Sequence, residues 1–152
     1  MLLRIVLGSI VAGFPLVCVE IASRRVQIKP EFSRKSTHVL SALSVVCIAA
    51  FCSLKEIAII AALFTILLTT TRATKLWHSL YRISRASWGE VLFPLGVCAA
   101  ALISPSTRAF ICAIVILGTA DTAANLAGQK FGVRKLPALG PKTYVGTATF
   151  FA

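Results

Sequence analysis

Acidic residues are scarce in this chain, and its cysteines lack the paired spacing of metal-binding or disulfide-linked proteins. Only five of the 152 residues are Asp or Glu, against sixteen Lys and Arg, which gives a formal net charge of +11. None of the five cysteines forms a C-x-x-C pair, and all five lie in apolar runs. This spacing argues against a zinc site and against a disulfide framework. We expect the cysteines to act as small apolar side chains.

Hydrophobic sequence is abundant instead. Hydrophobic residues make up 57% of the chain, and the mean hydropathy is +0.86. Apolar runs bounded by charged residues recur along the whole length, which is not typical of a soluble domain of this size. The sequence predicts an all-α, polytopic transmembrane helical bundle that forms a single integral-membrane domain over residues 1–152.

Five apolar segments are the candidate spans, although some are shorter than the ~20 residues that a bilayer requires. They cover about 5–22, 37–54, 57–71, 91–103 and 109–127. The first resembles a signal peptide but has no small-x-small cleavage site before the next charged segment, so we expect an uncleaved span. A further apolar run begins at the C-terminal end, and we expect one or two more spans beyond residue 152.

The basic residues are distributed unevenly between these segments. Thirteen of them lie in the connections 23–36, 72–90 and 128–143. The other three are Arg4, Lys55 and Arg108. By the positive-inside rule, this asymmetry predicts three cytoplasmic basic connections and an N-terminus outside. Because topology accounts for the positive charge, we expect no nucleic-acid partner.

The basic connection 72–90 has its own periodicity. Leu76, Leu80 and Tyr81 recur at helical spacing, while cationic residues occupy other faces. The pattern predicts an amphipathic helix over about 72–86 that lies on the cytoplasmic membrane surface.

The stretch "RKSTH" is the first candidate site. Arg34 and His38 share a helix face, and Ser33 or Ser36 could cap the helix start. An anionic ligand there would offset the cations and use the free backbone N–H groups. Alternatively, Arg34 and Lys35 are interfacial anchors and His38 is an interfacial polar group.

The stretch "SWGEVLFPLG" is the second candidate site, and Glu90 is its acidic residue. Ser87 and Glu90 fit a capping box, in which the carboxylate accepts a hydrogen bond from the Ser87 amide. Trp88 suits the membrane interface. A structural capping role and a functional role for Glu90 both remain open.

The third candidate site lies at the end of the last apolar segment. Gly118, Asp121, Asn125 and Gly128 fall on one helix face, with Asp121 roughly 10 Å along the axis from Gly128. An unpaired carboxylate at that depth costs about 2.5–3.5 kcal/mol. Tight helix packing explains the glycines but not the carboxylate. We therefore interpret Asp121 as functional.

The segment that follows contains the ingredients of a phosphate-binding loop. Glycines stand near lysines, and Lys142 is followed by Thr143. It is not a P-loop, because Pro141 separates Gly140 from Lys142 and no strand precedes it. A tight turn with cytoplasmic positive charge would explain the same residues.

Taken in order, four motifs resemble those of the membrane polyprenol, phytol and dolichol kinases. These CTP-dependent lipid kinases are distantly related to CTP:lipid-phosphate cytidylyltransferases. The motifs are "RKSTH", "WGEVLFPLG", "ADTAANLAGQKFG" and "KTYVGT", and they extend from residue 34 to residue 147. The resemblance implies an integral-membrane enzyme that phosphorylates a lipid alcohol, with CTP as donor and a divalent metal, expected to be Mg²⁺.

The resemblance also suggests roles for individual residues. Matching positions give the catalytic candidates Asp121, Glu90, His38 and Lys142. They give the nucleotide-binding candidates Arg34, Lys35, Asn125, Gly128, Lys130, Gly132, Thr143 and Gly146. We hypothesise that Asp121, with Glu90, holds the metal on the CTP phosphates, and that His38 or Glu90 accepts the proton of the lipid hydroxyl. Val145 stands where the family has an acid, and loss of that carboxylate would lower activity.

Two other functions use the same residues. One is transfer of CMP from CTP to a lipid phosphate, which would give a CDP-lipid. The other is a non-catalytic membrane protein or small transporter, with Asp121 as an ion-binding group. Neither the identity of the lipid nor the oligomeric state follows from the sequence.

Overall fold

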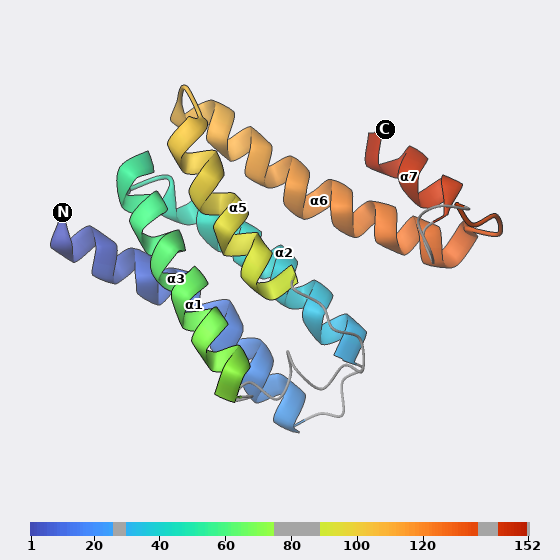
Figure 1. The fold of residues 1–152 in the computed structure, drawn as a ribbon, viewed down its shortest axis with the longest axis horizontal. Helices are drawn as coiled ribbons and strands as arrows, with labels where there is room; N and C mark the ends of the chain where they lie inside the picture. The colour runs from blue at the N-terminus through green and yellow to red at the C-terminus, as the bar shows by residue number, and fades with distance from the viewer. Residues whose placement is uncertain (26–29, 75–88, 137–142, 152) are drawn as a thin grey trace.

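The computed structural model describes residues 1–25, 30–74, 89–136 and 143–151, and this part of the chain is all-α, as the sequence predicts (Figure 1). The six helices described are α1 (Leu2–Arg25), α2 (Pro30–Ile48), α3 (Leu54–Thr74), α5 (Gly89–Ile103), α6 (Thr107–Phe131) and α7 (Tyr144–Phe151).

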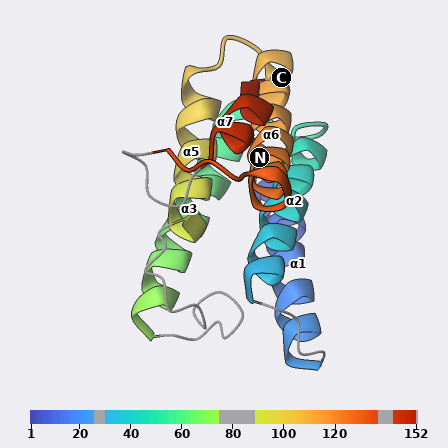
Figure 2. The same cartoon turned by 90° about the vertical axis from the view of Figure 1, so that its right-hand side faces the viewer.

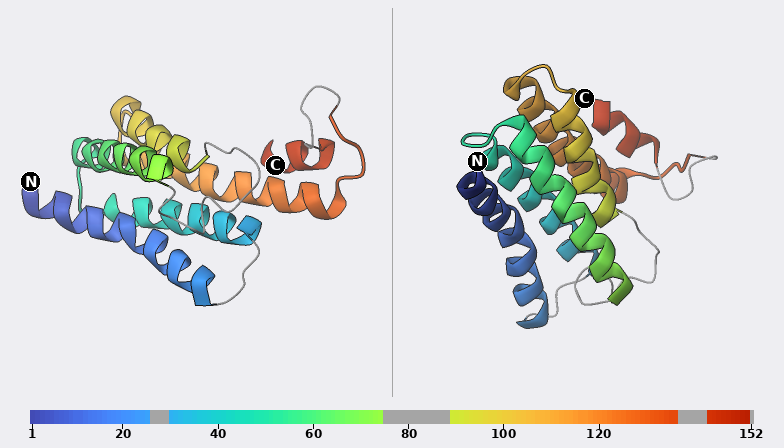
Figure 3. Two further views of the ribbon diagram at one scale, coloured as in Figure 1. Left: turned by 60° about the horizontal axis from the view of Figure 1, so that its bottom comes forward. Right: turned by 60° about the vertical axis from the view of Figure 1, so that its left-hand side comes forward.

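Successive helices from α1 to α6 run in opposite directions along the bundle (Figures 1 and 3). The N-terminus and the turns 49–53 and 104–106 lie at one end. The other end is where α1, α3 and α6 finish and where α2 and α5 begin; we call it the basic end. Described cations there include Arg25, Lys35, Arg72 and Lys130, whereas Arg4, Lys55 and Arg108 lie toward the opposite end.

The helices form two layers, with α3 and α5 in one and α1, α2 and α6 in the other (Figure 2). Within the layers, α3 packs against α5, and α2 packs against both α1 and α6. The shared core includes Ile48, Ile57, Val97, Phe110 and Ile114, all almost completely buried. The outer surface is apolar as well: Phe14, Ile66 and Leu102 are each more than 60% exposed. Extensive exposed apolar surface indicates contact with something other than water.

In the part of the chain that the structure describes, three helical segments are long and apolar enough to cross a membrane: Leu2–Ser23, Leu54–Arg72 and Thr107–Phe131. The apolar stretches of α2 and α5, Lys35–Ile48 and Gly89–Ile103, are shorter. These helices are consistent with an integral membrane protein.

Two predicted segment boundaries are wrong. The segment predicted over 37–54 ends as a helix at Ile48, and the turn 49–53 follows it. The next helix begins at Leu54 rather than at residue 57. A capping box explains this start, because the Ser53 amide donates to the Glu56 carboxylate at 2.8 Å and the Glu56 amide donates to Ser53 Oγ at 3.4 Å. In the predicted interfacial helix, residues 72–74 continue α3, and residues 75–86 lie outside the described residues.

The cap predicted for the "RKSTH" helix is also wrong. The helix begins at Pro30, a residue whose fixed φ and missing N–H suit the first helical position. Ser33 and Ser36 therefore lie inside α2, and Lys35 lies beyond its first four residues. An anion bound to the free N–H groups of this helix start would not lie beside Ser36 or His38.

The contact between α2 and α6 depends on a glycine. Gly118 is buried, and a Cβ added to it would lie 2.7 Å from Ala42 Cβ. Two methyl groups cannot approach so closely, so only glycine at position 118 permits this separation of the helices.

We predict that Gly118→Ala lowers the stability of the bundle by about 1–3 kcal/mol, because the added methyl group forces α2 and α6 apart. The matched control is Gly96→Ala, since a Cβ on Gly96 has no neighbour within 4 Å. The control should match or exceed wild-type stability, because alanine favours a helix over glycine. Thermal unfolding in detergent measures both variants. Equal melting temperatures for Gly118→Ala and wild type would contradict the close contact.

Candidate functional site

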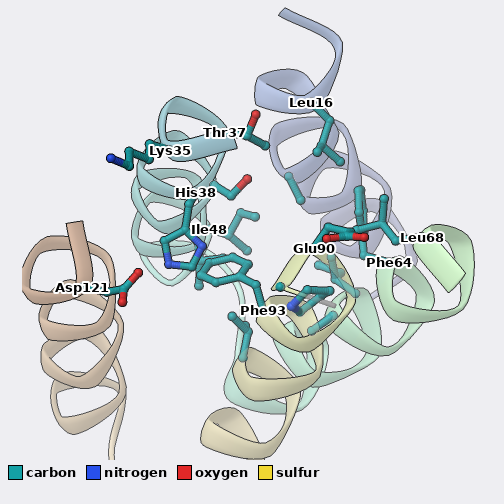
Figure 4. Close-up of a pocket in the computed structure, with 18 of the residues that line it drawn as sticks. Leu16, Lys35, Thr37, His38, Ile48, Phe64, Leu68, Glu90, Phe93 and Asp121 are labelled. Carbon is teal, nitrogen blue, oxygen red and sulfur yellow. The ribbon is translucent and has the colours of Figure 1, made fainter. Parts of the chain in front are cut away.

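A pocket of about 200 Å³ lies between the two layers (Figure 4). Helices α1, α2, α3, α5 and α6 all contribute to its wall. Five of the residues predicted from the sequence line it: Lys35, His38, Glu90, Asp121 and Asn125. They come from three of the four motifs and lie toward the basic end of their helices. The structure thus brings together residues that are up to 90 positions apart in the sequence.

The positions of these residues follow from the antiparallel packing of α2 and α6. Relative to the contact between Ala42 and Gly118, Lys35 lies seven residues back along α2 and Asn125 seven residues forward along α6. Both therefore lie about 10 Å from the contact, in the same direction. His38 and Asp121 lie closer to the contact, and the Asp121 carboxylate points toward His38 (Figure 4).

Asp121 itself is exposed, and no hydrogen bond or ion pair joins it to another residue in the part of the chain that the structure describes. The predicted face of α6 has three other residues, Gly118, Asn125 and Gly128. Each of them has a different neighbour. Gly118 contacts α2, Asn125 lines the pocket, and Gly128 contacts the start of α7. Every residue of the predicted face therefore contacts another helix or lines the pocket. Asp121 is the acidic residue of this face, and it lines the pocket.

A chain of hydrogen bonds connects α2 to α6 at this end of the pocket. Lys35 Nζ donates to Gln129 Oε1 at 3.1 Å, and Gln129 Nε2 donates to Asn125 Oδ1 at 2.9 Å. The ammonium group is thereby held on the α6 side of the pocket. Gln129 was not predicted as a site residue, although its spacing of four residues from Asn125 is a signal for this contact on a helix.

His38 lies between the helices rather than at an exposed interface. Its ring packs edge-on against Phe93 of α5, with the ring centroids 4.6 Å apart and an interplanar angle of 65°. Aromatic pairs of this geometry are favourable and fix the orientation of both rings. The packing directs the imidazole into the pocket wall near Asp121 (Figure 4).

Glu90 forms an ion pair with Arg72 at the end of α3. Its side chain is only 8% exposed, so the guanidinium provides charge compensation that a buried carboxylate requires. The proposed capping partner, Ser87, lies outside the described residues. Glu90 and Asp121 lie on opposite sides of the pocket, with His38 and Phe93 between them (Figure 4).

This separation bears on the metal site predicted from Asp121 and Glu90. Among the described residues, no group of three or more His, Cys, Asp or Glu could hold a metal ion. Mg²⁺ often uses one or two protein carboxylates and takes its other ligands from substrate phosphates and water. The exposed Asp121 fits that role by itself. The ion-paired Glu90, across the pocket, does not share a metal with it in this arrangement.

Four of the predicted nucleotide-binding residues form a separate cluster where α7 packs on α6: Gly128, Gly132, Thr143 and Gly146. A Cβ on Gly146 would lie 2.8 Å from the Ala124 carbonyl oxygen, and one on Gly128 would lie 2.9 Å from Thr143 Oγ1. The space beside these glycines is therefore filled by the chain itself. In this arrangement they support helix packing and do not line the pocket.

Thr143 has a local structural role in the same cluster. It is buried, and its Oγ1 accepts a hydrogen bond from the Gly146 amide at 3.2 Å, which is the geometry of an N-cap on α7. Lys130 is exposed at the end of α6, 5.3 Å from the centroid of the Phe131 ring. Lys142 lies outside the described residues, as does the side chain of Arg34.

We predict that Thr143→Val weakens the start of α7 by about 1 kcal/mol, because the variant loses the cap. Thr143→Ser keeps the hydroxyl and should retain most of the wild-type protection. Amide hydrogen exchange at Gly146 reports this directly, and exchange should be faster in Thr143→Val than in Thr143→Ser. Equal exchange rates in the two variants would contradict the capping role.

Comparisons with protein-family models, with curated proteins and with solved structures give no match for this chain. The resemblance to the lipid kinases therefore rests on the four sequence motifs and their order alone.

Proposed function

We propose that this protein is an integral-membrane lipid-alcohol kinase that transfers the γ-phosphate of CTP to a long-chain isoprenoid alcohol such as phytol, a polyprenol or dolichol. One observation carries the proposal: polar residues from three separate motifs line the same pocket, whose remaining wall is largely apolar. A kinase for a lipid alcohol needs this combination, because one substrate is highly charged and the other is almost entirely hydrocarbon. The fourth motif packs against the third through Gly146 and Gly128.

The charge distribution supports a membrane orientation for this pocket. We place α1, α2, α3, α5 and α6 across the bilayer, with the basic end in the cytoplasm and the N-terminus outside. The apolar stretch of α2, Lys35–Ile48, corresponds to about 21 Å of helix, which is shorter than the ~30 Å hydrocarbon core and therefore keeps Lys35 close to the interface. The polar lining residues then lie near the cytoplasmic interface, where a soluble nucleotide and a membrane lipid can meet.

Phosphoryl transfer depends mainly on positioning and on neutralisation of charge. Lys35, hydrogen-bonded to Gln129, provides a cation at the pocket. Arg34, Lys130 and Lys142 are the further cations that the motifs supply. Mg²⁺, held by Asp121 and the phosphate oxygens, would supply additional positive charge at the reacting phosphate.

His38 is the residue that we assign to proton transfer. An imidazole nitrogen accepts the hydroxyl proton while the lipid oxygen bonds to the γ-phosphorus and CDP leaves. The alternative base, Glu90, is already paired with Arg72. We infer that Glu90 positions Arg72 and the start of α5, and that it does not receive the proton.

Specific observations favour this function over the two alternatives. Lys35 is the one Lys or Arg among the described residues that line the pocket, which suits a neutral alcohol better than a second anionic substrate such as a lipid phosphate. For a transporter, polar groups should continue through the membrane depth. Here the lining toward the opposite end is apolar and includes Ile48, Ile57 and Val97.

The proposal predicts which phosphorus of CTP reaches the lipid. Membranes that contain the protein are incubated with lipid alcohols, lipid phosphates, Mg²⁺ and CTP labelled at either the γ or the α phosphorus. We expect the label in the lipid fraction from γ-labelled CTP alone. Label from α-labelled CTP would establish cytidylyl transfer instead, and no label from either in correctly inserted protein would contradict catalysis.

Asp121→Asn extends this test to the site. Because the variant removes the carboxylate but keeps the side-chain size, we expect at least a 100-fold loss of transfer with unchanged membrane insertion. Glu56→Gln is the control, since it removes a carboxylate at the opposite end of the bundle. Its amide oxygen can still accept the hydrogen bond from the Ser53 amide, so the variant should fold and retain the transfer activity of the wild type. Near-normal transfer by Asp121→Asn would refute its assigned role.

A further inference from the structure

The pocket has two chemically different ends. Toward the basic end its lining includes the polar residues Lys35, His38, Asp121 and Asn125. Away from that end the lining is made of aliphatic side chains. We call this part the apolar arm, and its wall includes Val45, Ile48, Ile60, Ala61 and Val97.

The pocket is also long in the direction of the helices. On α2 its lining residues extend from Lys35 to Ile48, which corresponds to about 20 Å along the helix axis. On α5 they extend from Gly89 to Val97 in the same direction. The change from polar to apolar lining therefore follows the bundle axis. A lipid in a bilayer has the same polarity, with its polar group at the interface and its chain toward the midplane.

The volume of the pocket bears on the number of hydrocarbon chains that it can hold. Protein interiors are close-packed and contain few voids larger than a water molecule, so a 200 Å³ pocket is not an ordinary packing defect. Apolar cavities stay dry and bind apolar molecules. Pockets for drug-sized ligands have about 300–1,000 Å³. A smaller volume extended over this length suits one narrow chain rather than two chains side by side.

We infer that the apolar arm binds the hydrocarbon chain of a lipid with a single chain, with its terminal hydroxyl group beside His38 and Asp121. The inference rests on the proposed function for the nature of the reacting group, and it adds where the hydrocarbon chain of the acceptor lies. Diacylglycerol, with two chains, does not fit. The chain lies inside the bundle, between α1 and α2 on one side and α3 and α5 on the other, and not along the outer surface.

A photoreactive alcohol tests the position of the chain without any nucleotide. The probe is hexadecanol with a diazirine at the carbon farthest from the hydroxyl, added to the full-length protein in membranes. After irradiation, mass spectrometry locates the label. We expect it at Ile48, Ile60 or Val97, with saturable labelling that unlabelled phytol competes for and diacylglycerol does not. Label confined to outward residues such as Leu63 and Ile66, or equal competition by diacylglycerol, would overturn the inference.

A matched pair of variants strengthens the test. Ala61 is buried and lines the apolar arm, whereas its neighbour Ala62 does not line the pocket. Ala61→Phe should block the arm and reduce the specific labelling at least tenfold, and Ala62→Phe should leave it unchanged. Wild-type labelling in a folded Ala61→Phe would contradict the assignment. If Ala61→Phe does not fold, the labelling positions in the wild-type protein decide the question.

The labelling experiment and the CTP transfer assay can fail independently of each other. Labelling of the apolar arm without phosphate transfer from CTP would retain the binding site and reject the kinase. Transfer of the γ-phosphate with label only on the outer surface would retain the kinase and reject this binding site.

Discussion

The close contact of α2 and α6 at Ala42 and Gly118 determines where the polar residues of the pocket lie. The two helices are antiparallel, so equal steps from this contact lead to positions that face each other. Seven residues toward the basic end bring Lys35 and Asn125 to the same level, and Gln129 connects them. His38 and Asp121 lie between this level and the contact. A shift of one helix along the other by a single turn, about 5.4 Å, would separate these residues.

The other helices complete the pocket by compensating its charges and closing its apolar part. Arg72 of α3 neutralises the nearly buried Glu90, and Phe93 of α5 orients His38. Asp121 remains the exposed carboxylate across the pocket. The arrangement places an anionic group, a cation and an imidazole at one end of a pocket whose other lining is largely apolar. This distribution suits the proposed reaction between a charged nucleotide and a long-chain alcohol.

Much of the architecture could be predicted because helical periodicity and charge asymmetry are local signals. The all-α fold was predicted, and each of the five predicted apolar segments overlaps a helix in the described part of the chain. Residues from three of the motifs line one pocket. The helix start at Pro30 was not predicted, because Ser33 and Ser36 both could serve as caps. The start at Leu54 was not predicted, because apolar residues continue through most of the turn 49–53. The partner of Glu90 was missed, since a contact with Arg72 depends on the packing of α3 against α5. The packing role of Gly128 and Gly146 likewise depends on where α7 lies, which no local pattern specifies.

The most direct test of the proposed nucleotide site is whether CTP protects its three helix segments, on α2, α5 and α6, from hydrogen exchange at the same concentration. Hydrogen exchange is measured by mass spectrometry on the protein in detergent micelles or nanodiscs, with and without CTP and Mg²⁺. We predict increased protection in 34–41, 89–94 and 121–129 at the same CTP concentration, with no change in the turn 49–53 at the opposite end. Protection confined to 132–151, or no protection in any of the three segments, would contradict the claim that these helices form one nucleotide site.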